Sequence, residues 1–361
     1  MAANPIPRMN EPRYRTTADQ FNTFKARLAD AFATGMAQQS FLTRIQQSLG
    51  VQLEESTKEL KASYPIMLPR AGFEQDIGPL VYKKWSETEV TSTPVNWRDG
   101  VSEDLRKHMS PGPSFLRDAN APALWAQAAL DTAEQRFCQV LNAGTSGTHG
   151  FDSAAFFCAL DATTKKINPK DASSRTYGNH KGITLDAADP IAFWEEIVDH
   201  FRAIPTPGAR GYLKLDPAFV LMSSKAEKIL SAVAEKKELR IKVGATEVQI
   251  EENRWQGKFD FAWTNELADN EMYVFARGGQ AGIPYIVHSL EGIEELFGAE
   301  FMAPQDWRAV TGTYLQPLVS MLGPESEHAI KNNEVLVQVS IDFDITPMCP
   351  WSVLKVKVTY A

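Results

Sequence analysis

The sequence predicts an α+β fold in which extended segments and one long helix accompany an α/β lobe. Three observations predict it. Residues 64–115 are dense in proline and glycine, which argues against any long helix there. Residues 118–141 are Ala-rich and contain no helix breaker beyond the first turn. Strand and helix patterns then alternate between residues 189 and 287, and two strand patterns end the chain.

Residues 1–64 predict an extended N-terminal arm followed by an amphipathic helix. Residues 1–15 hold three prolines and show no hydrophobic period. Thr17 and Gln20 match a capping box. Apolar residues follow at helical spacing: Phe21, Phe24, Leu28 and Phe32. A helix with one apolar face needs a partner surface, either on its own body or on a neighbouring chain.

Residues 65–115 predict an extended hairpin region. The stretch from Leu80 to Trp97 is rich in β-branched and aromatic residues with charges between them, which is typical of a long β-hairpin or loop. It holds too few apolar residues to form its own core, and a two-stranded hairpin alone is marginally stable in water. We therefore expect it to lie on another surface.

Residues 116–205 contain the longest predicted helix. Asp118 or Asn120 is expected to cap it, Pro122 suits its first turn, and Gly144 suits the position after its end. The expected core stripe is Leu124, Leu130, Ala133, Phe137, Val140 and Leu141. At about 1.5 Å per residue this helix is roughly 30 Å long. A second helix begins at Asp189 and Pro190, and its inward residues are Ile191, Trp194, Ile197, Val198 and Phe201.

Residues 206–300 predict the α/β lobe, and residues 301–361 predict strands that return to the core. A buried strand at 219–222 leads to a helix opened by a capping box at Ser224. Strands at 239–243, 247–250, 272–276 and 283–287 and an alternation of Phe259, Phe261 and Trp263 complete a mixed sheet. Two alternating strands end the chain, with Val335, Val337, Val339, Ile341 and Phe343 on one face and then Leu354, Val356 and Val358. We expect them to close a core begun by the long helix.

Composition limits the function classes. The 361 residues carry a net charge of −8, whereas a protein that binds nucleic acid by neutralising phosphates normally carries a basic surface. No apolar stretch approaches the ~20 residues that cross a bilayer, and the N-terminus lacks the pattern of a signal peptide. We therefore expect that the protein is made in a cytoplasm and does not associate with a membrane. Cys138, Cys158 and Cys349 lie far apart among apolar residues and are expected to be buried free thiols.

No motif indicates catalysis. The segment Gly144–Gly150 lacks both the phosphate-loop pattern and the nucleophile-elbow pattern, so a flexible loop after a helix is expected. Glu291, Glu294 and Glu295 are expected on a solvated helix face, and His200 is expected to be an ordinary surface histidine. We expect no enzymatic activity, no cofactor and no metal site.

The order of these elements resembles the Hong Kong 97-type capsid fold, with its N-terminal arm, E-loop, P-domain with a spine helix, and A-domain. The nearer resemblance is to the Mu-like major head subunit (gpT-like) family. In that family a helix ending in Leu-Leu-x-x-Gly precedes Gly-Phe-Asp-x-x-x-Phe-Phe. Here Val140-Leu141-Asn142-Ala143-Gly144 precedes Gly150-Phe151-Asp152-Ser153-Ala154-Ala155-Phe156-Phe157. The run Tyr212–Pro217 with Phe219–Leu221 is similar to the family's entry to the A-domain, whereas Cys158–Asp161 departs from the family's Asp-His-Pro.

This resemblance implies a major capsid protein of a tailed bacteriophage, located in the virion, that assembles with copies of itself into hexamers and pentamers. Portal proteins and scaffolding or decoration proteins are implied as further partners, and dsDNA would be enclosed without sequence-specific binding. The hairpin would lie over the adjacent subunit, and the arm would lie on the inner side of the shell or along a neighbour. The candidate interface residues are Tyr82, Lys83, Lys84, Trp85, Glu87, Glu89 and Trp97. Tyr82 and Trp85 are expected to pack on the neighbour, with the charged residues making rim contacts.

Two alternatives stay open at the level of sequence. An encapsulin-like compartment has the same fold and would hold an enzyme cargo. A soluble α/β hydrolase or transferase would show turnover and would be a compact monomer.

Overall fold

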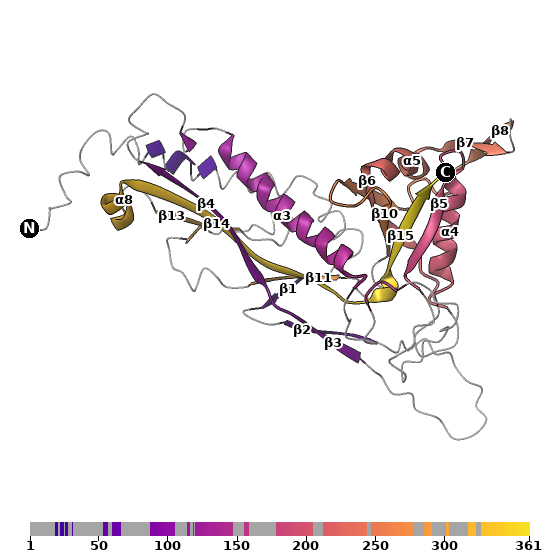
Figure 1. Ribbon diagram of the computed structural model, residues 1–361, viewed down its shortest axis with the longest axis horizontal. Helices are drawn as coiled ribbons and strands as arrows, with labels where there is room; N and C mark the ends of the chain where they lie inside the picture. Colours follow the sequence, from indigo (N-terminus) through magenta and orange to yellow (C-terminus); the bar gives the residue numbers. More distant parts are fainter. Residues whose placement is uncertain are drawn as a thin grey trace, which may run out of the picture.

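A long helix and a long strand set the length of the molecule. In the computed structural model, helix α3 (Ala121–Ala143) lies along one sheet, and an α/β lobe stands beyond its C-terminal end (Figure 1). The α+β class is confirmed. The structure describes residues 19–20, 22–24, 26–27, 31, 53–56, 60–65, 87–104, 114–115, 118, 120–146, 155–158, 178–204, 212–243, 247–277, 285–290, 301–302, 317–322 and 326–361.

The first sheet is built around strand β14 (Glu334–Pro347), which follows helix α8 (Glu327–Asn332). Its strands run in the order β1-β11-β14-β13-β12, and β4 also pairs with β14. The other strands are β1 (Leu53–Ser56), β4 (Val95–Asp104), β11 (Tyr285–Leu290), β12 (Phe301–Met302) and β13 (Pro317–Leu322). Val335, Val337, Val339 and Phe343 are buried, whereas Gln338 between them is exposed. The predicted alternation is therefore confirmed at these positions, and it gives the sheet one apolar face.

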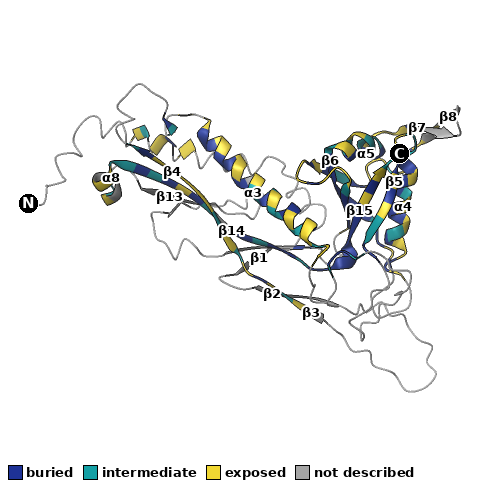
Figure 2. Ribbon diagram, in the orientation of Figure 1, coloured by how far each residue is buried: buried dark blue, intermediate teal, exposed yellow. Residues whose placement is uncertain are grey.

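Helix α3 covers that apolar face with a stripe that includes the predicted Ala133, Phe137 and Leu141, and Val140 packs half-buried against it. The side chain of Leu130 lies outside the described residues. Leu124 was expected in the core and is 67% exposed. The buried stripe is Trp125, Ala126, Ala129, Ala133, Phe137, Cys138 and Leu141 (Figure 2). The alanines let the helix approach the sheet closely, and Trp125 fills the space at its N-terminal end. Leu124 lies beside this stripe. A sequence pattern that gives most weight to large apolar residues placed it in the core, because it overlooks the alanines that make up much of the buried face.

The ends of α3 also differ in detail from the prediction. Asn120 occupies the N-cap position, but its side chain makes no capping hydrogen bond. Gly144 follows the helix with a φ of −63°, which is not the left-handed conformation expected of a glycine there. Its lack of a side chain matters for another reason, because an added Cβ would lie 2.7 Å from Cδ2 of Phe157. Gly144 is thus a point of close approach between the helix end and the segment 155–158.

The second sheet forms the lobe, in the order β5-β15-β10-β6-β9. Its strands are β5 (His180–Leu185), β6 (Pro217–Ser223), β9 (Asp260–Thr264), β10 (Glu271–Ala276) and β15 (Val353–Tyr360). Helices α4 (Pro190–Arg202) and α5 (Ser224–Glu235) pack on it. The Asp189 side chain caps α4 by accepting from the Ala192 N–H at 3.1 Å, as predicted. Helix α5 is capped one residue earlier than predicted, since Ser223 and not Ser224 accepts from the Ala226 N–H.

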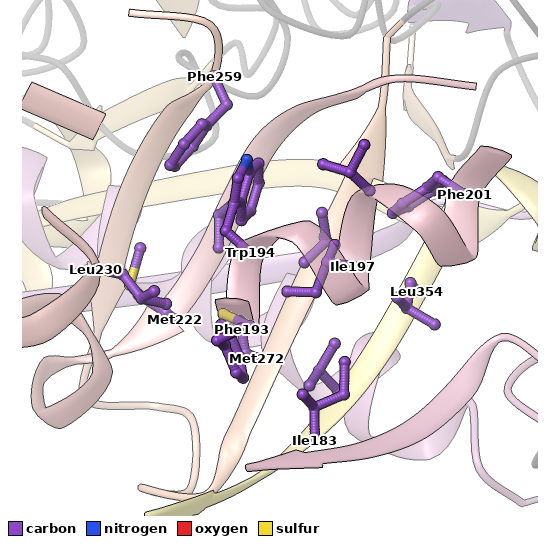
Figure 3. Packing of buried hydrophobic residues seen from close by; sticks show 14 of the residues in the cluster. Ile183, Phe193, Trp194, Ile197, Phe201, Met222, Leu230, Phe259, Met272 and Leu354 are labelled. Atoms are coloured by element: carbon purple, nitrogen blue, oxygen red, sulfur yellow. The ribbon is translucent and has the colours of Figure 1, made fainter. Parts of the chain in front are cut away.

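Both faces of the lobe sheet are buried, each in a different hydrophobic core. On β10, Tyr273 and Phe275 belong to the core beneath α3, whereas Met272 and Val274 belong to the core beneath α4 and α5. The second core includes Trp194, which stacks on Phe259 with ring centroids 3.9 Å apart (Figure 3). A strand buried on both faces is a continuous apolar run, which explains the sequence of β6. The lobe and the α3 region therefore share a packed layer and behave as one body.

These cores join segments that the predicted division of the chain lists separately. Helix α4 and strand β5, which precede the proposed boundary at residue 205, pack in the lobe with the segments that follow it. The C-terminal strands also divide, with β14 in the first sheet and β15 in the lobe. Strand β11, expected in the lobe's mixed sheet, pairs with β14. The chain thus crosses between the sheets several times, and hydrophobic periodicity carries no information about such crossings.

Several smaller predictions can be compared with the structure. The described residues of the N-terminal helix are helical, and Phe24 packs against Phe115 in the first core, so this part of the helix lies on its own body. Residues 1–18 of the arm lie outside the described residues. Trp263 is 52% exposed, because β9 is an edge strand and Trp263 lacks a neighbour on one side. None of the three cysteines forms a disulfide, and Cys138 and Cys349 are buried whereas Cys158 is half-buried.

Candidate subunit interface

The predicted interface residues are only partly within the described structure. Tyr82, Lys83, Lys84 and Trp85 lie outside the described residues, as does the side chain of Glu87. Glu89 is exposed on β3 (Glu87–Ser92). Trp97 is half-buried on β4, which is a strand of the first sheet.

The predicted hairpin has a different pairing. Strand β3 pairs with β2 (Leu60–Pro65), with Leu60 opposite Ser92, and the two form a separate ribbon. Strand β4, which was expected to belong to the same hairpin, pairs with β14 over its whole length. Pro94, which has no N–H, lies between β3 and β4 where the chain passes from the ribbon to the sheet. Trp97 and Val101 then pack on the first core, which fixes β4 in the body.

Asp344 on β14 anchors the β2–β3 ribbon to the body. Its Oδ2 accepts hydrogen bonds from the hydroxyls of Ser92 at 3.4 Å and Thr346 at 3.2 Å. Its Oδ1 is 3.3 Å from Nη2 of Arg136 on α3. Val90 is half-buried against the second core. The ribbon is thus fixed to the body at its Ser92 end.

Trp97 packs mainly within its own chain. Its ring stacks on Phe343 with centroids 5.9 Å apart and planes 26° apart. Its Nε1 is buried and makes no hydrogen bond within the described part of the chain. The face of the Trp97 ring toward Phe343 therefore packs in the first core.

A second ribbon, β7 (Glu238–Val243) and β8 (Glu247–Glu252), projects from the lobe outside both sheets (Figure 1). Its strands were predicted, but as part of the mixed sheet. The side-chain amide of Asn253 fixes its base, donating to the Val233 and Lys236 carbonyls at 2.6 and 2.7 Å. Those carbonyls end helix α5 and would otherwise be unpaired. The amide oxygen of Asn253 accepts from the Trp255 N–H at 3.0 Å, so the base is rigid while the ribbon extends outward.

Sequence reasoning did not single out a basic surface at one end of the lobe, here called the Tyr212 patch and comprising Tyr212, Arg202, Lys214, Asp216 and Arg277. The Tyr212 side chain is 60% exposed. Arg202 lies 3.5 Å from Asp216, and the Arg277 N–H donates to the Asp216 carbonyl. Lys214 has a φ of 53°, a conformation that no pattern in the sequence signals.

Burial shifts the pKa of several groups in the body. It raises the pKa of the Cys138 thiol to about 12 and raises that of Tyr273, so both stay protonated at neutral pH. Burial lowers the pKa of His200, whose Nε2 lies 2.8 Å from the Gly178 carbonyl. His200 is therefore a half-buried histidine bonded to the backbone, and not the surface histidine that was expected. Within the described residues, no group of three or more His, Cys, Asp and Glu side chains is placed to hold a metal ion. No described helix is both long enough and apolar enough to span a membrane.

Comparisons with known proteins give structural likeness without sequence likeness. No protein-family model and no curated protein sequence matches the chain. The capsid of Cyanophage P-SCSP1u is similar with a TM-score of 0.49 and 9% identity, over 86% of each chain. The mature capsid of bacteriophage PhiM1 is similar with a TM-score of 0.47 and 11% identity, over 85% of this chain and 84% of that one. The virus-like particle from Pyrococcus furiosus is similar with a TM-score of 0.44 and 12% identity, over 92% and 98%. TM-scores below 0.5 are too low to support a functional inference.

Proposed function

We propose that this chain is the major capsid protein of a tailed bacteriophage, with a Hong Kong 97-type fold, and that it assembles into an icosahedral shell. The observation that carries the proposal is the pair of two-stranded ribbons, β2–β3 and β7–β8, attached to a body with continuous cores. A two-stranded ribbon is marginally stable on its own in water. Ribbons anchored at one end gain stability from contact with neighbouring copies, which is what a shell supplies.

The body supports the same proposal. A shell subunit must hold its contact surfaces in fixed relation, because heterologous contacts close into rings only at a defined angle. The layer shared by the two cores joins the lobe to α3 through Tyr273, Phe275 and Phe219. The Tyr273 hydroxyl also donates to Oδ1 of Asn142 on α3 at 3.0 Å. This makes the subunit an elongated rigid block with ribbons as contact arms.

The candidate interface residues belong to this proposal. Tyr82 and Trp85 would pack on the adjacent subunit, since aromatic anchors dominate protein interfaces. Lys83, Lys84, Glu87 and Glu89 would make contacts at the rim of that interface. Trp97 would contribute to a contact only with the ring edge that Phe343 leaves uncovered.

The wider role follows from assembly. The subunits would form hexamers and pentamers, with portal and scaffolding or decoration proteins completing the head, and the protein would act in the virion without catalysis. A net charge of −8 per subunit disfavours tight phosphate binding, so the shell would enclose dsDNA and not grip it. Within this class we propose kinship with the Mu-like major head subunit family, on the residues quoted for it above.

Electron microscopy of the overexpressed full chain tests the proposal. Closed shells, or the rings and tubes that precede them, are the expected result. Particles isolated from the phage host should contain dsDNA, whereas an encapsulin-like compartment would contain an enzyme. A compact monomer at every protein and salt concentration would contradict the proposal.

A further inference from the structure

The β7–β8 ribbon places two like charges opposite each other at its base. Glu238 and Glu252 lie directly opposite each other in the ribbon, and both are exposed. Like charges directly opposite across an antiparallel pair are destabilising. Within the described part of the chain, neither carboxylate takes part in an ion pair. The whole ribbon has four acidic and two basic residues, a net charge of −2, and beside Glu252 it presents Ile250 with 59% of its surface exposed.

The Tyr212 patch has the opposite charge. Its three basic side chains and one acidic side chain give a net charge of +2, and the Tyr212 ring is exposed. Asp216 engages Arg202, while Lys214 and Arg277 are exposed and make no ion pair with any described residue. Among the described residues, the patch therefore offers two cations without an ion pair and an exposed apolar ring, and the ribbon offers two carboxylates without an ion pair and an exposed isoleucine.

The backbone holds Lys214 in a strained conformation. A positive φ is uncommon and unfavourable for a residue other than glycine, so it persists only where the surroundings enforce it. Leu213 and Leu215 on either side are buried, and the Leu213 N–H donates to the Ile204 carbonyl at 2.8 Å. The two buried leucines thus fix Lys214 on the surface beside Tyr212. Strain of this kind concentrates at contact and functional sites.

We infer that the β7–β8 ribbon of one subunit docks on the Tyr212 patch of a second copy of this chain. This inference rests on the proposed self-assembly and names the contact that drives it. Glu238 and Glu252 form the pair nearest the base of the ribbon, and Ile250 lies two pairs further out, so the contact forms where the ribbon leaves the lobe. Every copy carries one ribbon and one patch, so the contact is head-to-tail and joins successive copies into a ring. Glu238 and Glu252 pair with Lys214 and Arg277, and Ile250 packs on Tyr212.

Charge exchange in the full chain tests this contact. The patch variant is Lys214→Glu with Arg277→Glu, and the ribbon variant is Glu238→Lys with Glu252→Lys. All four residues are exposed, so each variant should fold with an unchanged thermal midpoint. Each variant alone should lose assembly into particles, measured by light scattering and electron microscopy, and the combination of all four substitutions should recover it.

A matched control separates pairing from net charge. Adding Asp131→Lys and Glu266→Lys to the patch variant restores the net charge of −8 at exposed sites away from the ribbon, and it should not recover assembly. The inference is overturned if either reversed variant assembles like the native chain, if the fourfold exchange stays unassembled, or if the control recovers equally. A native chain that never assembles would instead contradict the proposed function itself.

Discussion

Asn179 connects three segments of the chain where the two cores meet. Its side-chain amide donates to the carbonyls of Phe156 and Pro350, each at 2.8 Å, and accepts from the Cys158 N–H at 2.8 Å. The residue is 2% exposed, so water does not replace these bonds. An asparagine is suited to this position because it supplies two donors and an acceptor in one plane.

Replacing Asn179 by Ala should lower the free energy of unfolding by about 3 kcal/mol or more, because two buried carbonyls and one N–H lose their partners. Asn179→Asp should cost a similar amount, since a carboxylate keeps the bond from Cys158 and offers no donor to the carbonyls. Denaturant unfolding of both variants checks this, with Asn265→Ala on the exposed turn after β9 as the control. Equal midpoints for Asn179→Ala and Asn265→Ala would refute the junction role.

His200 should make subunit stability depend on pH. Burial lowers the pKa of His200 in the folded chain below its ordinary value of 6.5, so as pH falls through about 6.5 the unfolded chain takes up the proton first. The contribution of His200 is therefore fully present above pH 6.5 and is lost as pH falls toward the folded pKa.

His200→Gln keeps a donor for the Gly178 carbonyl and removes the titration. The free energy of unfolding should fall less for this variant than for the native chain between about pH 7.5 and pH 5. His180, whose pKa burial also lowers, remains in both proteins and so cancels in the comparison. Parallel pH profiles would show that His200 does not titrate in this window.

At the scale of elements, the sequence predicted helices better than sheet partners. Helix α4 begins at Pro190 after the predicted cap Asp189 and buries the predicted residues, because apolar residues recur with the helical period and the cap is local. Strand β4 was assigned to the wrong pair, since alternation says which residues are buried and not which strand lies beside them. The strained Lys214 and the opposed Glu238 and Glu252 depend on tertiary placement and register, so only the structure reveals the patch and the charge conflict.

Two tryptophans of the predicted hairpin region should now behave differently. Trp97→Ala removes a ring stacked on Phe343 in the first core, so it should lower subunit stability by about 2 kcal/mol. Trp85→Ala, at a proposed contact with the neighbour, should leave the thermal midpoint unchanged and impair assembly. Thermal unfolding and light scattering of both variants, compared with exposed Leu124→Ala on α3, distinguish the two roles. Unfolding of the subunit by Trp85→Ala would place that ring in the subunit's own core.

At the scale of the whole molecule, the shared sheet constrains how the subunit responds to its neighbours. Strands β6 and β10 place alternate residues in each core, so rotating the lobe against α3 would separate buried apolar surface on one face. Close-packed cores resist such displacement. Adaptation to different positions in a shell would therefore fall to the ribbons, which reach the second core through Leu239 on β7 and Val90 on β3 and otherwise extend from the body.

The central claim is that the chain folds as a subunit and acts as an assembly. The most direct measurement is the mass of the purified full chain by light scattering as its concentration is raised at moderate salt. The account predicts a sharp transition from subunits to closed particles of uniform, very large mass, because many weak contacts act together in a closed shell. A mass that stays at the 40.1 kDa of one chain across the whole range would contradict it.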